Sequence, residues 1–414
     1  MTEYDLSRGR RLRRGYSFDE VSVVPSRRTR DAADVDLGWQ IDAYRFAAPI
    51  MAAPVDSVMS PSSAATVADL GLLAVLGIEG LWCRYEDADP HLTEIAALPD
   101  SEATARMQQI YSRPIDPDLV AQRIADLRRP GRVVAAAVSP ARAAELGPVA
   151  VAAGVDLLVI RGTTVSAEHV ASTGEPIDLK RFIGDLETPV IVGGCANYQA
   201  ALHLMRTGAA GVLVGFGGGA AHRSANVLGI RVPMATAVAE VAEARRDYMD
   251  ESGGRYVHVL ADGSMGRSGH MVRALACGAD AVVVGSALAR GTDAPGRGYH
   301  WGMATFHPTL PRGARVQTVQ NGSLEEILVG PARENDGTFN LMGALRTSMA
   351  TCGYQDIAEF NRAELMVAPA LQTEGKQLQS SQGVGMGSRG GSAAAGGNNG
   401  APADKSGALS TTPA

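Results

Sequence analysis

The sequence predicts an α/β protein with a single (β/α)8 barrel, the TIM-barrel fold, over residues 16–371. Three observations predict it: short apolar runs, helical patterns between most of them, and glycines placed where a helix ends before the next run. The runs are mostly non-alternating, which is typical of strands buried on both faces of a parallel sheet. Eight buried strands are the count of this barrel. The eight runs are residues 48–52, 73–76, 133–138, 157–160, 190–192, 211–214, 257–260 and 281–284.

Helical patterns occupy the segments between runs, as in residues 197–207 and 235–249. Gly154, Gly208 and Gly278 each stand three residues before the next apolar run. Glycine adopts the left-handed conformation that ends a helix, so these positions predict helix termini. A doubly wound sheet is the alternative fold, and it is expected to carry G-x-G-x-x-G after its first strand. The first run here leads into AAPVDSVMS instead, which favours the barrel.

The two ends of the chain differ in composition from the predicted barrel. Residues 1–15 predict a solvated basic arm, with a phosphate or partner contact as the alternative, because they contain Arg8, Arg10, Arg11, Arg13 and Arg14. Residues 380–414 are rich in Gly, Ser, Ala and Asn and hold almost no large apolar side chain. Such a segment buries too little surface to offset its ordering entropy, so this tail is predicted to be disordered.

Composition and charge narrow the class of protein. A net charge of −6 over 414 residues gives no electrostatic basis for binding nucleic acid or an acidic membrane surface. The four cysteines form no C-x-x-C pair, which argues against a zinc site and fits a reducing compartment. No apolar run reaches the roughly 18 residues of a membrane span, and the charged N-terminus lacks the apolar stretch of a signal peptide. We therefore expect a cytoplasmic protein with no nucleic-acid or membrane partner.

Glycine-rich and polar segments follow the last three predicted strands, where a barrel of this kind builds its site. Residues 215–224 (GFGGGAAHRS) follow the sixth strand, Asp262-Gly263-Ser264 the seventh and Gly285-Ser286 the eighth. Glycine clusters let backbone N–H groups approach an anion, and the segments after strands seven and eight are the usual phosphate cradle. The Asp262 carboxylate suits two ribose hydroxyls. The alternative is that the glycines only make tight turns and Asp262 caps a helix, but three such segments together favour a nucleotide site.

Further motifs extend along nearly the whole predicted barrel in a fixed order. They are YSFDEV at 16–21, residues 51–59, Gly193-Gly194, residues 215–224, VLADG at 259–263, VGS at 284–286, TDAPG at 292–296 and WGM at 301–303. Together they resemble the IMP dehydrogenase/GMP reductase family. Within it, the chain most resembles the bacterial IMP dehydrogenase-related paralogues that lack the regulatory pair of CBS domains. Residues 77–132, between the second and third runs, are too few for two such domains and their linkers.

The resemblance implies a reaction at C2 of a purine. In the family a cysteine thiolate attacks C2 of IMP, hydride leaves to NAD, and hydrolysis gives XMP, while GMP reductase uses its cysteine similarly to expel ammonia. Here that position is His222, and the hydroxyl two positions on is kept as Ser224. Three roles are open for His222: a general acid/base or atypical nucleophile, a neutral group that hydrogen-bonds the purine, or a loop residue without a role. Other family contacts are replaced by Ala53, Val55, Arg161, Gly162, Cys195 and Ala220.

The resemblance also implies binding residues. Arg161 and Thr163 are expected on the side of the cofactor, NAD or NADP, where Arg161 either pairs with a cofactor phosphate or forms a surface ion pair. Cys195 is a displaced nucleophile or, as we favour, a small apolar filler. Carbonyl oxygens of Gly215 and Gly217 are expected to hold a monovalent cation such as K+. The expected contacts to a purine nucleoside monophosphate are Gly219, Asp262, Gly263, Gly285, Ser286, Gly302 and Met303.

Two classes of function follow. The first is a purine nucleotide oxidoreductase, with IMP oxidation by NAD as the family default and GMP reduction by NADPH as the rival. The second is a nucleotide-binding regulator that has lost catalysis, because removal of a covalent nucleophile commonly costs on the order of 10³–10⁶ in rate. The family also implies a homo-oligomer, a tetramer or an octamer, in either case.

Overall fold

The computed structural model describes residues 3–7, 10–170, 176–216 and 218–368, together with residues 378, 379 and 382. The predicted disordered tail, residues 380–414, lies outside the described residues except for Gln382.

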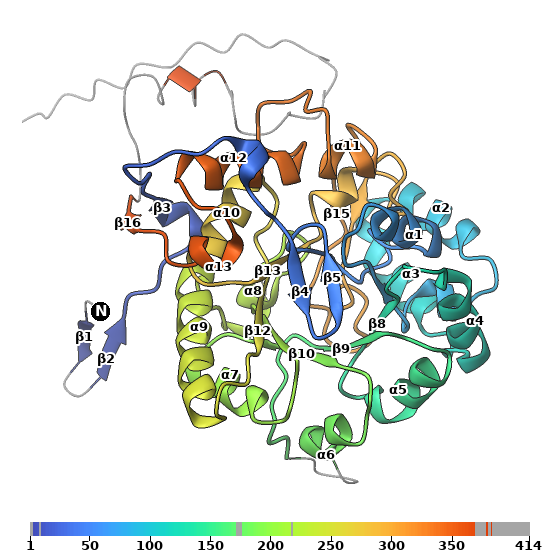
Figure 1. Cartoon of the computed structure of the whole chain (residues 1–414). Coiled ribbons are helices and arrows are strands. Elements are labelled where there is room, and N and C mark those ends of the chain that lie inside the picture. The colour runs from blue at the N-terminus through green and yellow to red at the C-terminus, as the bar shows by residue number, and fades with distance from the viewer. Residues whose placement is uncertain are drawn as a thin grey trace, which may run out of the picture.

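Eight parallel strands form a closed barrel at the centre of the fold, which confirms the predicted class (Figure 1). Their order around the barrel follows the chain from β7 to β13, and β13 pairs with β6. A parallel bridge between Met51 and Leu73 closes the ring. The barrel strands are β6 (Ile50–Ala52), β7 (Val75–Gly77), β8 (Ala135–Val138), β9 (Leu157–Arg161), β10 (Val190–Cys195), β11 (Gly211–Val214), β12 (His258–Asp262) and β13 (Ala281–Val284).

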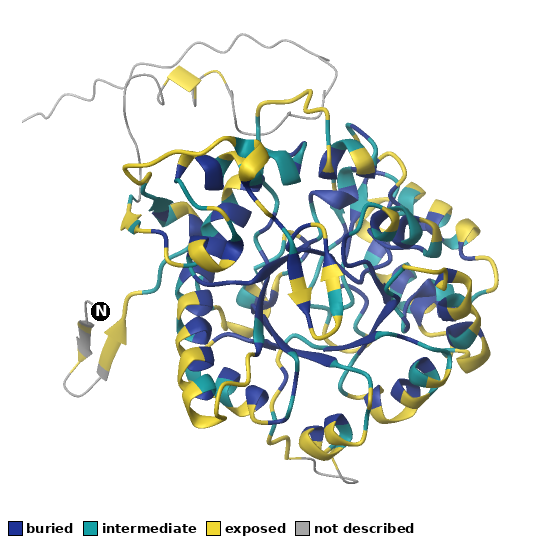
Figure 2. Ribbon diagram, viewed as in Figure 1, coloured by how far each residue is buried: buried dark blue, intermediate teal, exposed yellow. Residues whose placement is uncertain are grey.

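Helices surround the barrel, with buried faces toward the strands and exposed faces outward (Figure 2). The expected helix ends are confirmed at Gly154, Gly208 and Gly278, whose φ angles are 90°, 96° and 108°. The helices are α1 (Pro61–Asp69), α2 (Asp89–Ala97), α3 (Asp100–Tyr111), α4 (Pro117–Leu127), α5 (Ala143–Ala152), α6 (Leu179–Gly184), α7 (Tyr198–Met205), α8 (Ser224–Leu228), α9 (Met234–Glu251), α10 (Ser268–Ala276), α11 (Leu324–Leu328), α12 (Leu341–Thr351) and α13 (Ile357–Phe360). Short 3₁₀ turns are Phe18–Glu20, Ala32–Asp34, Leu81–Cys83 and Leu288–Arg290.

Small antiparallel hairpins complete the fold. The β4–β5 hairpin covers the N-terminal end of the barrel, where Nε1 of Trp39 donates to Nδ1 of His258 at the start of β12. Strand β3 pairs antiparallel with β16, the last strand that the structure describes. The bounds are β3 (Val21–Val23), β4 (Trp39–Ile41), β5 (Tyr44–Phe46), β14 (Tyr299–His300), β15 (Val316–Gln317) and β16 (Leu365–Val367).

The basic arm is more structured than the sequence indicated. Its described residues form a hairpin of β1 (Glu3–Ser7) and β2 (Arg10–Arg13), which projects from the body beside α9 (Figure 1). Arg13 at the end of β2 pairs with Glu240 of α9 over 2.8 Å. The run is dominated by arginine, so the sequence shows no alternation of apolar and polar residues that would have predicted these two short strands.

A second apolar cluster lies outside the barrel and holds the segment between β14 and β15. We call this segment, residues 301–315, the flap. Trp301 and Phe306 of the flap are buried against α2 and α3. The guanidinium of Arg315 donates to the carbonyl of Leu98 over 2.7 Å and to Oδ1 of Asp100 over 2.7 Å. The helices inserted between β7 and β8 therefore fasten one side of the flap.

Candidate functional site

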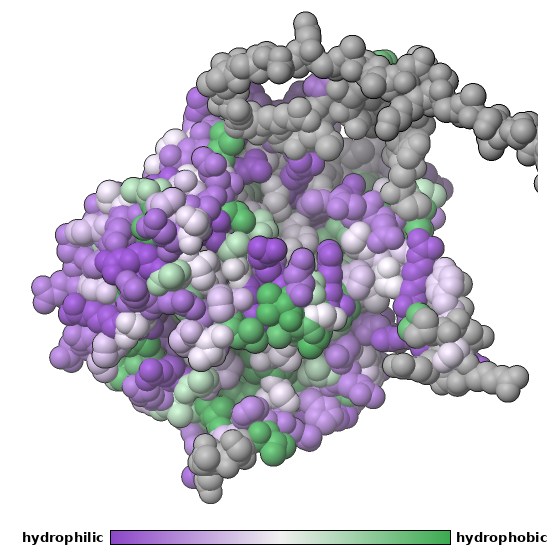
Figure 3. Space-filling view, turned by 180° about the vertical axis from the view of Figure 1, so that it is seen from behind, coloured by the Kyte–Doolittle hydropathy of each residue, from purple (hydrophilic) through white to green (hydrophobic). Residues whose placement is uncertain are grey.

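A cavity of about 290 Å³ opens at the C-terminal ends of the barrel strands. The opposite side of the molecule from the β4–β5 hairpin shows apolar side chains near its middle, among mostly hydrophilic ones (Figure 3). Eleven residues that the sequence singled out line this one cavity: Arg161, Thr163, Gly215, Gly219, His222, Asp262, Gly263, Gly285, Ser286, Gly302 and Met303. Ser224 lies behind His222 and is fully buried. Gly217 lies outside the described residues.

His222 is held by its neighbour in the loop after β11. Its Nδ1 lies 3.2 Å from Oγ of Ser224, the first residue of α8, so Nε2 is left for the cavity. Burial lowers the pKa of His222, Arg161 and Arg312 lower it further, and Asp262 opposes them. The imidazole is therefore uncharged at neutral pH and can accept a proton.

The loop that carries His222 is hydrogen-bonded to the flap. The backbone N–H of Arg223 donates to the carbonyl of Arg312 over 2.8 Å, and the N–H of Ala314 donates to the carbonyl of Ala221 over 2.8 Å. A bridge between His222 and Gly313 lies between these two bonds. The flap thus joins α2 and α3 on one side and the His222 loop on the other, and it forms one wall of the cavity.

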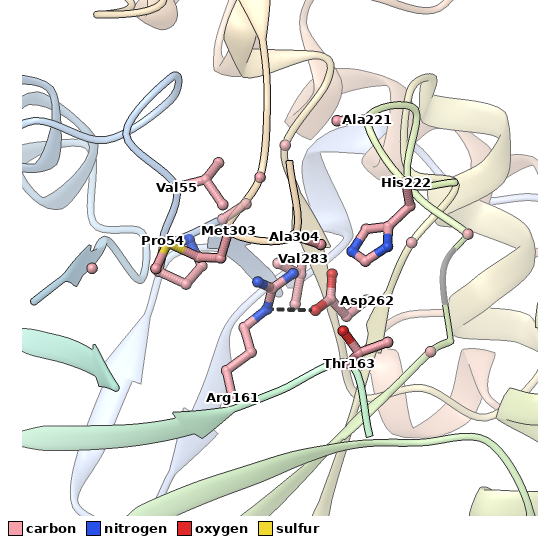
Figure 4. Close-up of a pocket in the computed structure, with 18 of the residues that line it drawn as sticks. Pro54, Val55, Arg161, Thr163, Ala221, His222, Asp262, Val283, Met303 and Ala304 are labelled. Carbon is pink, nitrogen blue, oxygen red and sulfur yellow. Dashed lines mark hydrogen bonds and ion pairs between the residues drawn. The ribbon is translucent and has the colours of Figure 1, made fainter. Parts of the chain in front are cut away.

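Arg161 and Asp262 form an ion pair across the mouth of the barrel. Arg161 ends β9 and Asp262 ends β12, and Nε of Arg161 lies 2.8 Å from Oδ2 of Asp262 (Figure 4). About a fifth of each side chain is exposed, toward the cavity that both line. Burial lowers the pKa of Arg161, but the charge and hydrogen bond of Asp262 raise it by more. Sequence reasoning placed the two residues on different ligands and did not anticipate that they pair.

The segments after β12 and β13, where the sequence predicts a phosphate cradle, both line the cavity. Gly263 has a φ of 138°, which side chains rarely allow, and it lies against the backbone of Gly218. Ser264 is left-handed, with a φ of 64°, and its hydroxyl donates to the carbonyl of Gly218 over 2.9 Å. The cradle and the His222 loop are therefore one connected surface.

His300, which sequence reasoning missed, lies beside the cradle. It lines the cavity next to Gly285, and its Nδ1 lies 3.0 Å from Oγ of Ser57. Burial lowers the pKa of His300 to about 4, with further lowering by His222 and Arg161. The sequence did contain a signal for His300, because this residue directly precedes the WGM motif.

Glu79 and Arg312 also line the cavity and were missed. Glu79 follows β7 by two residues, so the same strand-end rule that found Asp262 applies to it. Its carboxylate accepts from the backbone N–H of Ser139 over 2.5 Å and from the Ser139 hydroxyl over 3.0 Å. Arg312 belongs to the flap, and no sequence pattern marks which flap side chain turns inward.

Cys195 does not line the cavity. It is buried at the end of β10, and its thiol donates to the carbonyl of Leu213 over 3.4 Å. Burial raises the pKa of Cys195 to about 12, so the thiolate that a nucleophile requires is strongly disfavoured. These observations agree with the apolar-filler interpretation.

The model of the IMP dehydrogenase/GMP reductase domain matches residues 15–377, which is most of the chain. The chain belongs to the IMP dehydrogenase/GMP reductase family. It is therefore an oxidoreductase of this family by descent, and the resemblance carried by the motifs is confirmed. No described helix is both long and apolar enough to cross a membrane. Within the same described ranges, no three His, Cys, Asp or Glu side chains gather as a metal site would require.

Three known proteins are similar to the chain over different parts of its length. A protein of Mycolicibacterium smegmatis named an uncharacterized oxidoreductase is 49% identical over 371 residues, which cover 88% of this chain and 99% of that protein. The inosine-5'-monophosphate dehydrogenase of Thermoplasma acidophilum is 33% identical over 224 residues, 51% of this chain and 44% of that enzyme. The crystal structure of an IMP dehydrogenase/GMP reductase-like protein from Corynebacterium glutamicum is 46% identical, with a TM-score of 0.85 over 88% of this chain and 98% of that one.

Proposed function

We propose that the protein is an NAD(P)-dependent oxidoreductase of purine nucleoside monophosphates, with oxidation of IMP to XMP as its reaction. The supporting observation is that the nine residues chosen from the sequence for a nucleotide or a cofactor all line one cavity, together with His222. Ligands of barrel enzymes bind at this end of the strands. The meeting of these segments at one cavity is what a single nucleotide site requires.

The nucleotide lies along the cavity from the cradle to the flap in this proposal. Backbone N–H groups of the segments at Gly263, Gly285 and Ser286 hold the phosphate, and Oδ1 of Asp262, which no described group engages, accepts from the ribose. The base lies under Gly302 and Met303 and beside Gly219. At Gly302 even an added Cβ would meet nothing within 4 Å, so the cavity is open there to a flat ring.

His222 moves the proton. With no cysteine among the described cavity residues, the oxygen of a water molecule forms the new bond to C2 of IMP directly, and neutral His222 takes the proton that the water releases. Ser224 fixes the ring through Nδ1, which leaves Nε2 as the base. A bound NAD would supply the acceptor for the hydride that leaves C2. The products are XMP, the reduced cofactor and one proton, as the balance requires.

The cofactor is proposed to enter beside Thr163, where Gly162 and Arg161 also face the cavity. Thr163 and Gly162 are the residues proposed to contact the cofactor there, because the charge of Arg161 is already paired with Asp262. We also propose a K+ ion at the carbonyls of Gly215 and Gly217, and a homotetramer or octamer. The oligomer is tested by light scattering of the purified protein, and K+ by activity in potassium against choline chloride.

The test of the main proposal is turnover. IMP with NAD is expected to produce reduced cofactor, seen in its near-ultraviolet absorbance, and His222→Ala is expected to remove most of that signal while IMP still binds. GMP with NADPH is the parallel assay for the reductase alternative. If Asp262→Ala binds IMP as tightly as the wild-type chain does, the nucleotide placement is wrong.

A second candidate function is a nucleotide-binding regulator without catalysis. The observation that favours it is the absence of any thiol from the described cavity lining, because Cys195 is buried elsewhere. The result that selects it is an increase in melting temperature with IMP or GMP and no turnover in either assay.

A further inference from the structure

Arg161 leaves most of its hydrogen-bonding capacity unused. Only Nε pairs with Asp262, and neither Nη atom has a hydrogen-bond partner among the described residues. A guanidinium has donors only, and its two Nη groups form a fork that fits two adjacent acceptor atoms. The ion pair fixes the direction of the fork, so the missing acceptors must come from whatever fills the cavity.

The fork faces the part of the cavity assigned above to the base. In Figure 4 the guanidinium lies between Asp262 and the side chains of Met303 and Pro54, and His222 is on the other side of Asp262. Val55 lines the same cavity. Pro54, Val55 and Met303 have no strong acceptor in their side chains. Donors left unpaired in such an apolar setting are costly, so the acceptors of the ligand decide how well it binds.

Purine nucleotides differ at C2 in the way that such a fork distinguishes. Xanthine carries a carbonyl oxygen there, whose two lone pairs can accept from both groups of the fork, and hypoxanthine carries only a C–H. Guanine carries an amino group, whose N–H donors oppose those of arginine. A site built of donors binds a ligand that lacks an acceptor weakly, and it binds a ligand that presents further donors more weakly still.

We propose that Arg161 is a specificity-determining residue that reads the C2 edge of the base and selects purine monophosphates with oxygen, and against an amino group, at that carbon. The inference rests on the proposed binding of a nucleotide in this cavity. It assigns XMP as the best-bound purine monophosphate and makes GMP a poor ligand, so it separates the dehydrogenase from the reductase alternative. Asp262 acts here as the positioning residue for the fork.

The experiment is calorimetric titration of the full chain with XMP, IMP and GMP. We expect XMP to bind about tenfold or more tightly than GMP, with IMP between them. The test variant is Arg161→Met with Asp262→Asn, because removal of Arg161 alone would leave a buried charge. Loss of the Asp262 contact weakens all three nucleotides alike, so the ratio of XMP to GMP affinity reports the fork. In the variant this ratio is expected to fall toward one.

The matched control removes another arginine–carboxylate pair far from the cavity. Arg206→Met with Glu251→Gln deletes the exposed pair between the residue after α7 and the last residue of α9, whose atoms lie 2.6 Å apart. This variant is expected to keep the wild-type ratio. Equal affinity of the wild type for GMP and XMP overturns the inference and leaves nucleotide binding intact. The inference is also overturned if the variant keeps the ratio of XMP to GMP affinity but loses affinity for NADPH relative to NADH. That result would place a cofactor phosphate on the fork. Failure of all three nucleotides to bind refutes the proposed function itself.

Discussion

The hydroxyl of Tyr111 donates to Oδ2 of Asp56 over a distance of 2.7 Å, at a point where both side chains are buried. The same hydroxyl accepts from Nε1 of Trp301 over 3.0 Å, and the backbone N–H of Leu81 donates to Oδ2 of Asp56 over 2.8 Å. Asp56 follows Pro54 and Val55 of the cavity wall, while Trp301 begins the flap. One phenol therefore joins the loop after β6, helix α3 and the flap.

The first prediction concerns the pH dependence of stability at Asp56. Burial raises the pKa of Asp56 to about 6, against the lowering effects of Tyr111, Leu81 and Arg84. The folded state thus holds the proton more tightly than the unfolded state, so this group favours folding below about pH 4 and loses that contribution as the pH rises to about 6. The difference of about two pH units corresponds to ~3 kcal/mol. Asp56→Asn should remove this slope.

The measurement is urea denaturation of both proteins at several values between about pH 4 and pH 7. The free energy of unfolding of Asp56→Asn, relative to the wild type, is expected to rise across this range. Parallel curves for the two proteins would show that Asp56 does not titrate there.

The second prediction is that Tyr111→Phe loosens the flap. The substitution removes the donor to Asp56 and the acceptor for Trp301, and a buried group left unpaired costs about 1–3 kcal/mol. Hydrogen exchange of residues 301–315 should become faster, and the affinity for IMP should fall. Tyr85→Phe is the matched control, because among the described residues the Tyr85 hydroxyl donates only to the carbonyl of Ile110, over 2.9 Å. Equal exchange in both variants would contradict a role for Tyr111 in holding the flap.

The barrel was predictable because each strand is buried on both faces and shows as an apolar run. Ala281–Val284 and Gly211–Val214 have the predicted bounds. The strands β9, β10 and β12 instead extend past their runs, to Arg161, Cys195 and Asp262. A prediction from hydropathy ends each strand where polar or small residues begin. The hydrogen bonds between strands instead continue to the rim of the barrel. Two of these three residues, Arg161 and Asp262, line the cavity.

The lining of the cavity was largely predictable because chain order fixes which strand ends meet. The pairing of Arg161 with Asp262 was not, because it joins residues 101 positions apart and depends on side-chain direction. His300 was missed for a related reason. Its role follows from the position of the flap, which depends on helices α2 and α3 and on contacts such as that of Gln108 with the carbonyl of His307. No local pattern records such contacts.

The third prediction concerns the N-terminal end of the barrel, where Arg245 and Asp280 form a buried ion pair. Nη1 of Arg245 lies 2.6 Å from Oδ2 of Asp280, and each side chain is 8% exposed. Asp280 also accepts from the Tyr256 hydroxyl and the backbone N–H of Val259. Arg245→Met leaves a buried carboxylate without its counter-charge, so we expect a loss of about 3–5 kcal/mol in thermal or urea unfolding. Combining it with Asp280→Asn should recover much of that loss, and a double variant no more stable than the single one would disprove the charge explanation.

The last prediction separates the space for the ligand from the packing of the protein, with two glycines of the same cavity. A Cβ at Gly302 would meet no atom within 4 Å, so Gly302→Ala should change the free energy of unfolding by no more than about 0.5 kcal/mol. The methyl group would extend into the space proposed for the base, and the affinity for IMP should fall severalfold. At Gly215, by contrast, a Cβ would overlap the backbone oxygen of Asp262. Gly215→Ala should therefore lower the melting temperature strongly even without ligand. Melting curves with and without IMP measure both effects. If IMP raises the melting temperature of Gly302→Ala as much as that of the wild type, the base does not lie against the flap.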